Sequence, residues 1–125
     1  MALVGLSHYA IRLAPETVEK TAAFYVNVLG LKRGYRPPFN FPGAWLYAGD
    51  SAVVHLIGGP DPDRPADTGR LDHIAFDAKS IAEMRAHLSA RGVAFEERKV
   101  PDSDLRQLFV RDPNGIRIEL NYRGE

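Results

Sequence analysis

The sequence has no cysteine, no excess of charge of either sign and no long apolar run. Without cysteine, the protein can form no disulfide, thiol nucleophile or thiolate metal site. Its 16 basic and 16 acidic residues give a formal net charge of zero, which argues against nucleic acid or an anionic membrane as the main partner. The opening residues M-A-L-V-G-L-S-H-Y lack the basic start and apolar core of a signal peptide, and no apolar run is long enough to span a bilayer. We therefore expect a cytoplasmic protein.

The chain consists of two similar halves. Residues 5–13 read G-L-S-H-Y-A-I-R-L and resemble residues 70–78, R-L-D-H-I-A-F-D-A, with a histidine at the fourth place of each stretch. A helix-like stretch and three strand-like runs follow in both halves, and a connector rich in proline and glycine lies between them. The length of 125 residues suits one domain. We predict a single α+β domain over residues 1–125, with two βαβββ modules at 5–57 and 70–122 and a linker at 58–69.

Two helices are predicted. The first covers residues 15–29, with a proline in its first turn and Gly30 after its end. The second begins at S-I-A-E (80–83), which has the pattern of a capping box between Ser80 and Glu83, and it ends at Gly92. Their apolar faces comprise Val18, Ala22, Tyr25 and Leu29 in the first helix and Ile81, Met84 and Leu88 in the second. His87 lies outside the second stripe, so we expect it to be exposed to solvent.

Three strands are predicted after each helix. They cover residues 31–35, 44–48 and 51–57 in the first half and 94–100, 106–111 and 116–122 in the second. The last two strands are joined by D-P-N-G, a strong tight-turn signal, and G-D occupies the same place in the first half.

The last strands of the two halves carry polar residues at equivalent places. When residues 52–58 are aligned with 116–122, His55 lies opposite Glu119, and the histidines of the first strands, His8 and His73, also correspond. Alternation along a strand places Arg117, Glu119 and Asn121 on the face opposite to the apolar residues that should meet the helix. If the helix-free faces of the modules meet in a cup, His8, His55, His73 and Glu119 converge there.

Three histidines and one glutamate are a typical ligand set for a metal ion. A buried unpaired carboxylate costs several kcal/mol, and an unpaired imidazole costs roughly 1–3 kcal/mol. One divalent ion (Zn, Ni, Mn, Co or Fe(II)) bound by His8, His55, His73 and Glu119 would offset these costs together. The alternative is that each histidine is a hydrogen-bonded core residue and that Glu119 pairs with Arg117 or Arg12.

The sequence around these residues resembles the vicinal oxygen chelate superfamily. This superfamily includes glyoxalase I, extradiol dioxygenases, fosfomycin-resistance thiol transferases, methylmalonyl-CoA epimerase and bleomycin-resistance proteins. The resemblance rests on four motifs: G-L-S-H-Y-A-I-R (5–12), F-Y-V-N-V-L-G-L (24–31), L-D-H-I-A-F-D (71–77) and F-V-R-D-P-N-G-I-R-I-E-L (109–120). It implies paired βαβββ modules in a half-open eight-stranded β-barrel cup with the helices outside. It also implies one divalent metal and a homodimer.

Departures from the family patterns favour the glyoxalase-like branch. Resemblance to glyoxalase I would predict a carboxylate at the position of His55, so only Glu119 can serve as the proton-transfer base here. Arg12 resembles the arginine that holds the glutathione carboxylate in glyoxalases. Extradiol dioxygenases have a histidine and a tyrosine before the D-P-x-G turn, whereas this chain has Gln107 and Phe109 in that region. The residue set for phosphonate and potassium in fosfomycin enzymes finds no match, and bleomycin-resistance proteins usually lack the metal ligands.

We predict that the loop R-P-P-F-N-F-P-G-A-W (36–45) forms part of the substrate-binding surface. Its prolines limit loop freedom, and Phe39, Phe41 and Trp45 offer apolar surface for a small, partly apolar, oxygen-bearing substrate. Arg12 and Gln107 complete the predicted substrate contacts. The alternative is a loop that packs internally or forms a dimer contact.

Three functions remain open at this point. The first is a divalent-metal-dependent glyoxalase-like lyase or isomerase, in which Glu119 is a ligand and the catalytic base. The second is an Fe(II) extradiol-type dioxygenase that acts on a catechol-like compound. The third is a non-catalytic protein that binds an apolar small molecule, as bleomycin-resistance proteins do.

Overall fold

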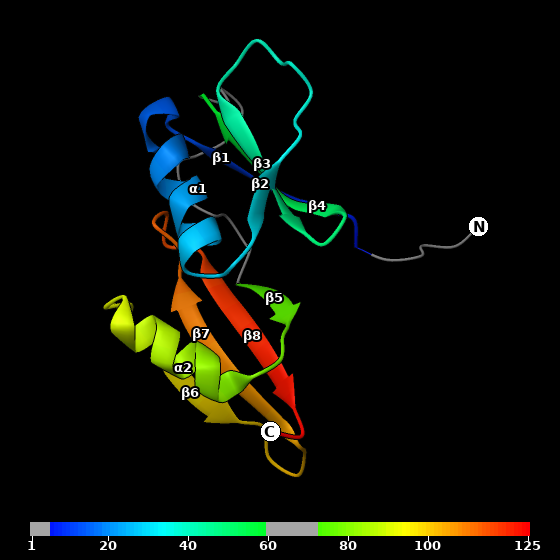
Figure 1. Ribbon diagram of the computed structural model, residues 1–125, viewed down its shortest axis with the longest axis vertical. Helices are drawn as coiled ribbons and strands as arrows, with labels where there is room; N and C mark the ends of the chain where they lie inside the picture. Colours follow the sequence, from blue (N-terminus) through cyan, green and yellow to red (C-terminus); the bar gives the residue numbers. More distant parts are fainter. Residues whose placement is uncertain (1–5, 60–72) are drawn as a thin grey trace, which may run out of the picture. The chain divides into compact units, whose positions relative to one another are not determined.

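The structure is a computed structural model that describes residues 6–59 and 73–125. The chain divides into two compact units, Met1–Pro65 and Ala66–Glu125. Each unit has one α-helix and a four-stranded sheet in the order βαβββ (Figure 1), so the predicted α+β class and the two modules are confirmed. Residues 60–69 of the predicted linker, together with Gly5 and residues 70–72 of the two first-strand motifs, lie outside the described residues. That both modules belong to one domain stays a prediction.

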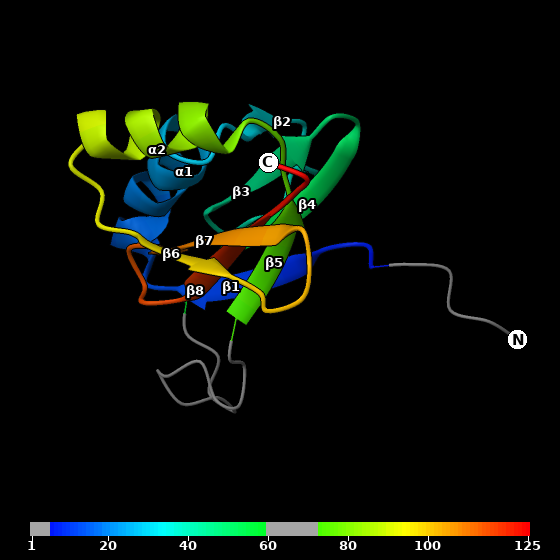
Figure 2. The ribbon, with the colours of Figure 1, turned by 90° about the horizontal axis from the view of Figure 1, so that it is seen from below.

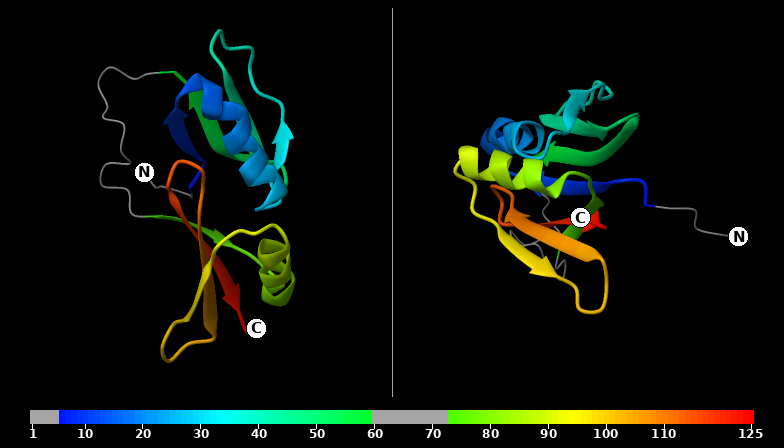
Figure 3. Two further views of the ribbon diagram at one scale, coloured as in Figure 1. Left: turned by 90° about the vertical axis from the view of Figure 1, so that its left-hand side faces the viewer. Right: turned by 60° about the horizontal axis from the view of Figure 1, so that its bottom comes forward.

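The first module forms a sheet with the strand order β1-β4-β3-β2. Strand β1 runs parallel to β4, and the other neighbouring pairs are antiparallel. Helix α1 packs on this sheet, as the left view of Figure 3 shows. The elements are β1 (Tyr9–Leu13), a 3-10 helix (Pro15–Thr17), α1 (Val18–Asn27), β2 (Lys32–Gly34), β3 (Gly43–Ala48) and β4 (Ser51–Gly58).

The second module repeats this arrangement with the strand order β5-β8-β7-β6. Strand β5 is parallel to β8, and the remaining pairs are antiparallel. Helix α2 lies on one side of this sheet (Figure 2). The elements are β5 (His73–Asp77), α2 (Ile81–Ala90), β6 (Glu96–Lys99), β7 (Leu105–Arg111) and β8 (Arg117–Arg123).

The register of the two sheets confirms the predicted internal equivalence. His55 lies opposite Ala10 in the parallel β1–β4 pair, and Glu119 lies opposite Ala75 in the parallel β5–β8 pair. Ala10 and Ala75 each follow the module's first histidine by two residues. The two modules therefore present His55 and Glu119 at the same place in the same kind of ladder.

Side-chain alternation sets the two faces of each sheet. In β8, Ile118, Leu120 and Tyr122 are buried, whereas Glu119 and Asn121 between them are partly accessible. The apolar set contributes about 1.5–3 kcal/mol per fully buried side chain. The predicted division of β8 into an apolar face and a polar face is thus confirmed.

The first helix differs from its prediction at both ends. A single 3-10 turn precedes α1, which ends at Asn27 rather than at Leu29. The chain then turns at Gly30, whose φ of 81° is in the left-handed region that favours glycine. Because of this turn, Val28 is buried in place of the predicted Leu29, which is only half-buried.

The predicted capping box of the second helix is wrong. Ser80 has a left-handed backbone with φ 70°, and its hydroxyl makes no capping bond, because a capping side chain needs an extended backbone at that position. The backbone amides of Ser80 and Ile81 instead donate to the carboxylate of Glu125, at 3.0 and 2.7 Å. An anion at the positive end of α2 thus replaces the local cap. His87 is exposed, as predicted.

Neither helix in the described part of the chain is long and apolar enough to cross a membrane.

Candidate functional site

His73 and Glu119 lie side by side in the second module. His73 is the first residue of β5, and Glu119 lies in the middle of the neighbouring strand β8, on the face that α2 does not cover. His73 Nε2 is 3.2 Å from Glu119 Oε2, and the Glu119 side chain is only 12% exposed. Two ligands that each lie about 2.0–2.2 Å from one ion are separated by about this distance. The pair is in direct ion-pair contact, and its spacing is also that of two ligands of a single metal ion.

Gln107 in β7 holds the other oxygen of Glu119. Its Nε2 donates to Glu119 Oε1 at 2.8 Å and to Asn121 Oδ1 at 3.2 Å. One carboxylate oxygen is thus fixed by an amide, while the second faces His73. The sequence placed Gln107 among substrate contacts, which stays a prediction. The hydrogen bond to Glu119 is a role that sequence reasoning missed, and only the pairing of β7 with β8 reveals it.

Arg117 does not form the ion pair with Glu119 that the sequence left open as an alternative. Its guanidinium carbon lies 4.2 Å from the centre of the Phe109 ring. Glu119 interacts instead with His73 and Gln107. The interpretation of Glu119 as a mere partner of Arg117 is therefore wrong.

The two histidines of the first module also meet, but in a different way. The rings of His8 and His55 stack with centroids 3.8 Å apart and planes at 12°. Trp45 stacks on His55 at 3.9 Å and 10°. Because two rings cannot occupy the same space, His8 and Trp45 lie on opposite faces of His55. His55 is thus enclosed between two aromatic rings.

His55 also has a defined protonation pattern. Its Nε2 lies 3.0 Å from the carbonyl oxygen of Ala52, so this nitrogen donates and Nδ1 carries the free lone pair. Burial lowers the pKa of His55 below its ordinary value of 6.5, and the neighbouring His8 lowers it further, against a smaller opposite effect of the Ala52 carbonyl. The ring is therefore neutral near pH 7, which is the form that binds metals.

The stacked pair does not fit a metal ion as it is arranged. An imidazole lone pair lies in the ring plane, and the planes of His8 and His55 are nearly parallel. One ion cannot lie in both planes, so one ring must leave the stack before both can act as ligands. His8 is exposed, precedes β1 and is held near Ser7 Oγ at 3.0 Å. Among the residues that the structure describes, no three His, Asp or Glu side chains are grouped closely enough to hold an ion.

A hollow of about 480 Å³ opens beside the stacked rings of the first module. It is lined by Leu6, Ser7, His8, Trp45, Ser51, Ala52, Val53 and His55. Two of the predicted metal ligands and one predicted substrate contact therefore border the same space.

The loop between β2 and β3 continues the aromatic surface from Trp45. The ring centroid of Phe39 lies 6.5 Å from that of Trp45, and Phe39 stacks with Phe41 at a centroid distance of 5.1 Å. The two phenylalanines are 46% and 38% exposed. The guanidinium of Arg36 lies over both rings, at 5.1 and 5.0 Å. The three predicted aromatic contacts thus lie together, and their role toward a substrate stays a prediction. So does that of Arg12, which is an exposed residue of β1.

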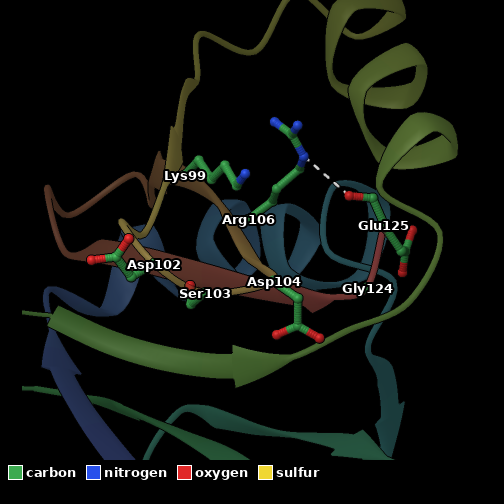
Figure 4. Close-up of a pocket in the computed structure, with 7 residues that line it drawn as sticks. All are labelled: Lys99, Asp102, Ser103, Asp104, Arg106, Gly124 and Glu125. Atoms are coloured by element: carbon green, nitrogen blue, oxygen red, sulfur yellow. Dashed lines mark hydrogen bonds between the residues drawn. The ribbon is translucent and has the colours of Figure 1, made fainter.

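A second hollow of about 650 Å³ lies in the second module, near the β6–β7 turn and Glu125 (Figure 4). Lys99 and Arg106 line it together with Asp102 and Asp104, and Arg106 Nε donates to the backbone oxygen of Glu125 at 3.0 Å. None of the predicted site residues lines this hollow. Its charges of both signs are those of a solvated surface, so it does not compete with the His73–Glu119 pair as a candidate site.

Comparison with known protein families shows to which family the chain belongs. Residues 5–120 match the model of the Glyoxalase/Bleomycin resistance protein/Dioxygenase superfamily. The chain belongs to this superfamily. The resemblance inferred from the four motifs is therefore confirmed. Members of the superfamily typically bind a divalent metal, bind small molecules and often form dimers.

Solved structures of the superfamily share the fold at low sequence identity. A protein assigned to the glyoxalase family from Bacillus anthracis has a TM-score of 0.79 at 22% identity, with 98% of both chains covered. Lactoylglutathione lyase from Agrobacterium tumefaciens has 0.71 at 19% identity, covering 98% of this chain and 96% of its own. TnmS3, an antibiotic-binding protein from a Streptomyces species, has 0.72 at 23% identity, with 98% of both chains covered. These similarities concern the fold alone.

Proposed function

We propose that the protein is a divalent-metal-dependent lyase or isomerase of the glyoxalase type. Its substrate would be small, partly apolar and bound through oxygen atoms. The observation that carries this proposal is the His73–Glu119 pair, with 3.2 Å between a ring nitrogen and a carboxylate oxygen. This pair lies on the helix-free face of the second module, and Gln107 braces the carboxylate.

We assign the metal to His73 and Glu119, with His55 and His8 completing the ligand set. The resemblance to the superfamily supports this assignment, because it implies that both helix-free faces contribute to one cup. When bound, a divalent ion polarises a carbonyl oxygen and makes the neighbouring C–H more acidic. His8 would have to turn out of its stack with His55 to take part.

Glu119 is the proposed catalytic base. A base must keep a fixed orientation toward the carbon from which it takes a proton. Gln107 supplies that orientation, because its amide holds Oε1 at 2.8 Å and leaves Oε2 on the side of His73. The limited exposure of the side chain, 12%, restricts competition from water. The carboxylate can then accept a proton from one substrate carbon and return it to a neighbouring atom.

Metal analysis of protein purified without added metal tests the proposal. We expect about one nickel, zinc, manganese or cobalt ion per chain, lost in His73→Ala and kept in His87→Ala. The second variant is a matched control, because His87 is an exposed histidine of α2. Iron that bleaches in oxygen would favour the extradiol-type dioxygenase instead. Full metal content in His73→Ala would contradict the assignment.

The His55→Glu variant tests the glyoxalase type. It supplies the carboxylate that the resemblance to glyoxalase I would predict at this position. We expect isomerisation of the methylglyoxal–glutathione adduct to appear or rise in this variant. Loss of the metal in the variant would instead show that the imidazole is needed for binding.

A non-catalytic binding protein is the second candidate function. The aromatic surface of the first module favours it, since Trp45, Phe39 and Phe41 offer flat apolar contacts beside a hollow. One fold relative, TnmS3, is an antibiotic-binding protein. Binding of an aromatic compound that is unchanged by metal removal and by His73→Ala, with no turnover, would select this function. We also propose a homodimer, which light scattering after size-exclusion chromatography tests directly.

A further inference from the structure

Arg117 is a residue of β8 next to the His73–Glu119 pair. It precedes Glu119 by two residues in β8, so both side chains project from the same face of the sheet. In the parallel β5–β8 ladder, its direct partner is His73. Neighbouring strands lie about 4.8 Å apart. The Arg117 backbone therefore lies next to that of His73, and its guanidinium lies over Phe109, the cross-strand partner of Glu119.

No carboxylate neutralises Arg117 within the part of the chain that the structure describes. Its guanidinium has neither an ion pair nor a hydrogen bond to a described residue. Other arginines of the second module do have acidic partners, such as Arg85 with Glu97 and Arg98 with Glu96. Arg117 is half-buried, so its charge is only partly hydrated and is open to an anionic ligand.

The contact with Phe109 positions the guanidinium of Arg117 and leaves its N–H donors without a hydrogen bond to a described residue. The guanidinium carbon of Arg117 lies over the Phe109 ring, 4.2 Å from its centroid, a distance that suits stacking of the guanidinium on the ring. Arg98 lies over the same ring at 4.9 Å. The N–H donors lie in the guanidinium plane and stay available. They have the fork geometry that matches the two oxygens of a carboxylate.

We propose that Arg117 binds a carboxylate group of the substrate. The substrate class would then be a 2-oxo or 2-hydroxy carboxylate, with its charged group on Arg117 and its neighbouring oxygen at the His73–Glu119 pair. The proposal rests on the proposed function, because it takes that pair as the place of the chelated oxygen. With a divalent ion bound, the charges of the ion and of Arg117 would together exceed the single negative charge of Glu119, and the site would attract an anion.

The test uses two probes that share the 2-oxo group and the phenyl ring: benzoylformate, which is an anion, and its methyl ester, which is neutral and larger by one methyl group. Binding to the Co(II)-loaded protein is followed by the visible cobalt spectrum and by calorimetry. We expect the wild type to prefer the anion. The Arg117→Gln variant should lose about tenfold or more in affinity for benzoylformate, as expected for a charge-assisted hydrogen bond, and keep its affinity for the ester and for cobalt.

Two further variants separate recognition from general charge and from misfolding. Arg111→Gln removes a positive charge directly opposite Arg117 in the β7–β8 ladder, from a residue whose guanidinium is bonded to the Gly115 carbonyl. It should bind both probes as the wild type does. Arg117→Lys keeps the charge without the planar fork, so it should recover only part of the preference. Thermal melting of each variant verifies the fold.

Equal loss of both probes in Arg117→Gln, or no loss of either, would overturn the proposal. The same loss of benzoylformate in Arg111→Gln would also overturn it, since long-range charge would then be sufficient. If the wild type takes up no cobalt, the proposed function fails. In that case, the two probes titrated into metal-free protein still decide on Arg117, because a preference for the anion that Arg117→Gln abolishes supports it and no preference refutes it.

Discussion

Replacing Gln107 by leucine removes the donor that holds one oxygen of the Glu119 carboxylate. The bond is short, at 2.8 Å, and its acceptor belongs to a side chain that is 12% exposed, so water can replace it only in part. A hydrogen bond to a charged group contributes about 1.5–3 kcal/mol. Loss of a residue that orients a metal ligand typically lowers metal affinity by about 10–100-fold. We therefore expect the dissociation constant for Co(II) to rise about tenfold or more, which corresponds to about 1.4 kcal/mol or more.

Competition between the protein and a chromophoric chelator measures this change, and the cobalt spectrum shows whether the coordination geometry is altered. Arg106→Gln is the matched control, because Arg106 directly precedes Gln107 in β7 and contacts Glu97 and the backbone of Glu125 rather than Glu119. Its cobalt affinity should equal that of the wild type. Equal cobalt affinities for Gln107→Leu and Arg106→Gln, with both variants folded, would refute the positioning role of Gln107.

Three further predictions concern stability and titration. Within the part of the chain that the structure describes, the buried Tyr122 hydroxyl has no hydrogen-bond partner. Burial, with a smaller effect of the Glu125 charge, raises the pKa of Tyr122 to about 12. Tyr122→Phe should raise the free energy of unfolding by about 1 kcal/mol in urea titrations, and a loss of stability would contradict the lack of a partner. Glu125→Ala removes the anion at the start of α2 and should lower stability by about 1 kcal/mol, with faster amide exchange in that helix. Arg85 lowers the pKa of Glu97 below 4.5. The pair therefore adds stability at higher pH, and this stability is lost as the pH falls through the pKa of Glu97 in the folded protein. In Arg85→Met the pKa of Glu97, measured by NMR titration, should return toward 4.5.

The two modules differ at the position of Gln107. In the β3–β4 ladder Gly43 lies opposite Ile57, as Gln107 lies opposite Asn121 in the β7–β8 ladder. A Cβ at Gly43 would collide with the backbone oxygen of Leu56 and with the side chain of Arg36. The first module therefore has no room for a bracing amide. The carboxylate of the second module is held by an amide, whereas His55 is held by ring stacking and by its hydrogen bond to the Ala52 carbonyl.

Much of the fold could be predicted because the same βαβββ pattern occurs in both halves of the sequence. The repeated strand motif and the turn signals predicted eight strands, all of which form, with boundaries that shift by at most four residues. The equivalence of His55 and Glu119 followed from the same repeat. The capping box at Ser80 failed because its true partner, Glu125, is 45 residues away. A local pattern contains no information about such a partner.

The candidate site was predictable as a set of residues but not as a set of contacts. Strand alternation placed His73 and Glu119 on one face, and the structure brings them to 3.2 Å. The same reasoning grouped His8 with His55 but did not indicate that their rings stack. Stacking depends on the rotamers of both rings and on Trp45 from another strand.

The sequence by itself determined the two modules, the tight turn between the last two strands of each, and which polar residues share a face. It could do so because the period of a strand and the repeat of the chain depend only on residue order. The tertiary structure alone decided that Gln107 holds Glu119 and that Arg117 rests on Phe109 instead of pairing with Glu119. Those contacts join neighbouring strands, where register, side-chain rotamers and competition between donors select one partner among several.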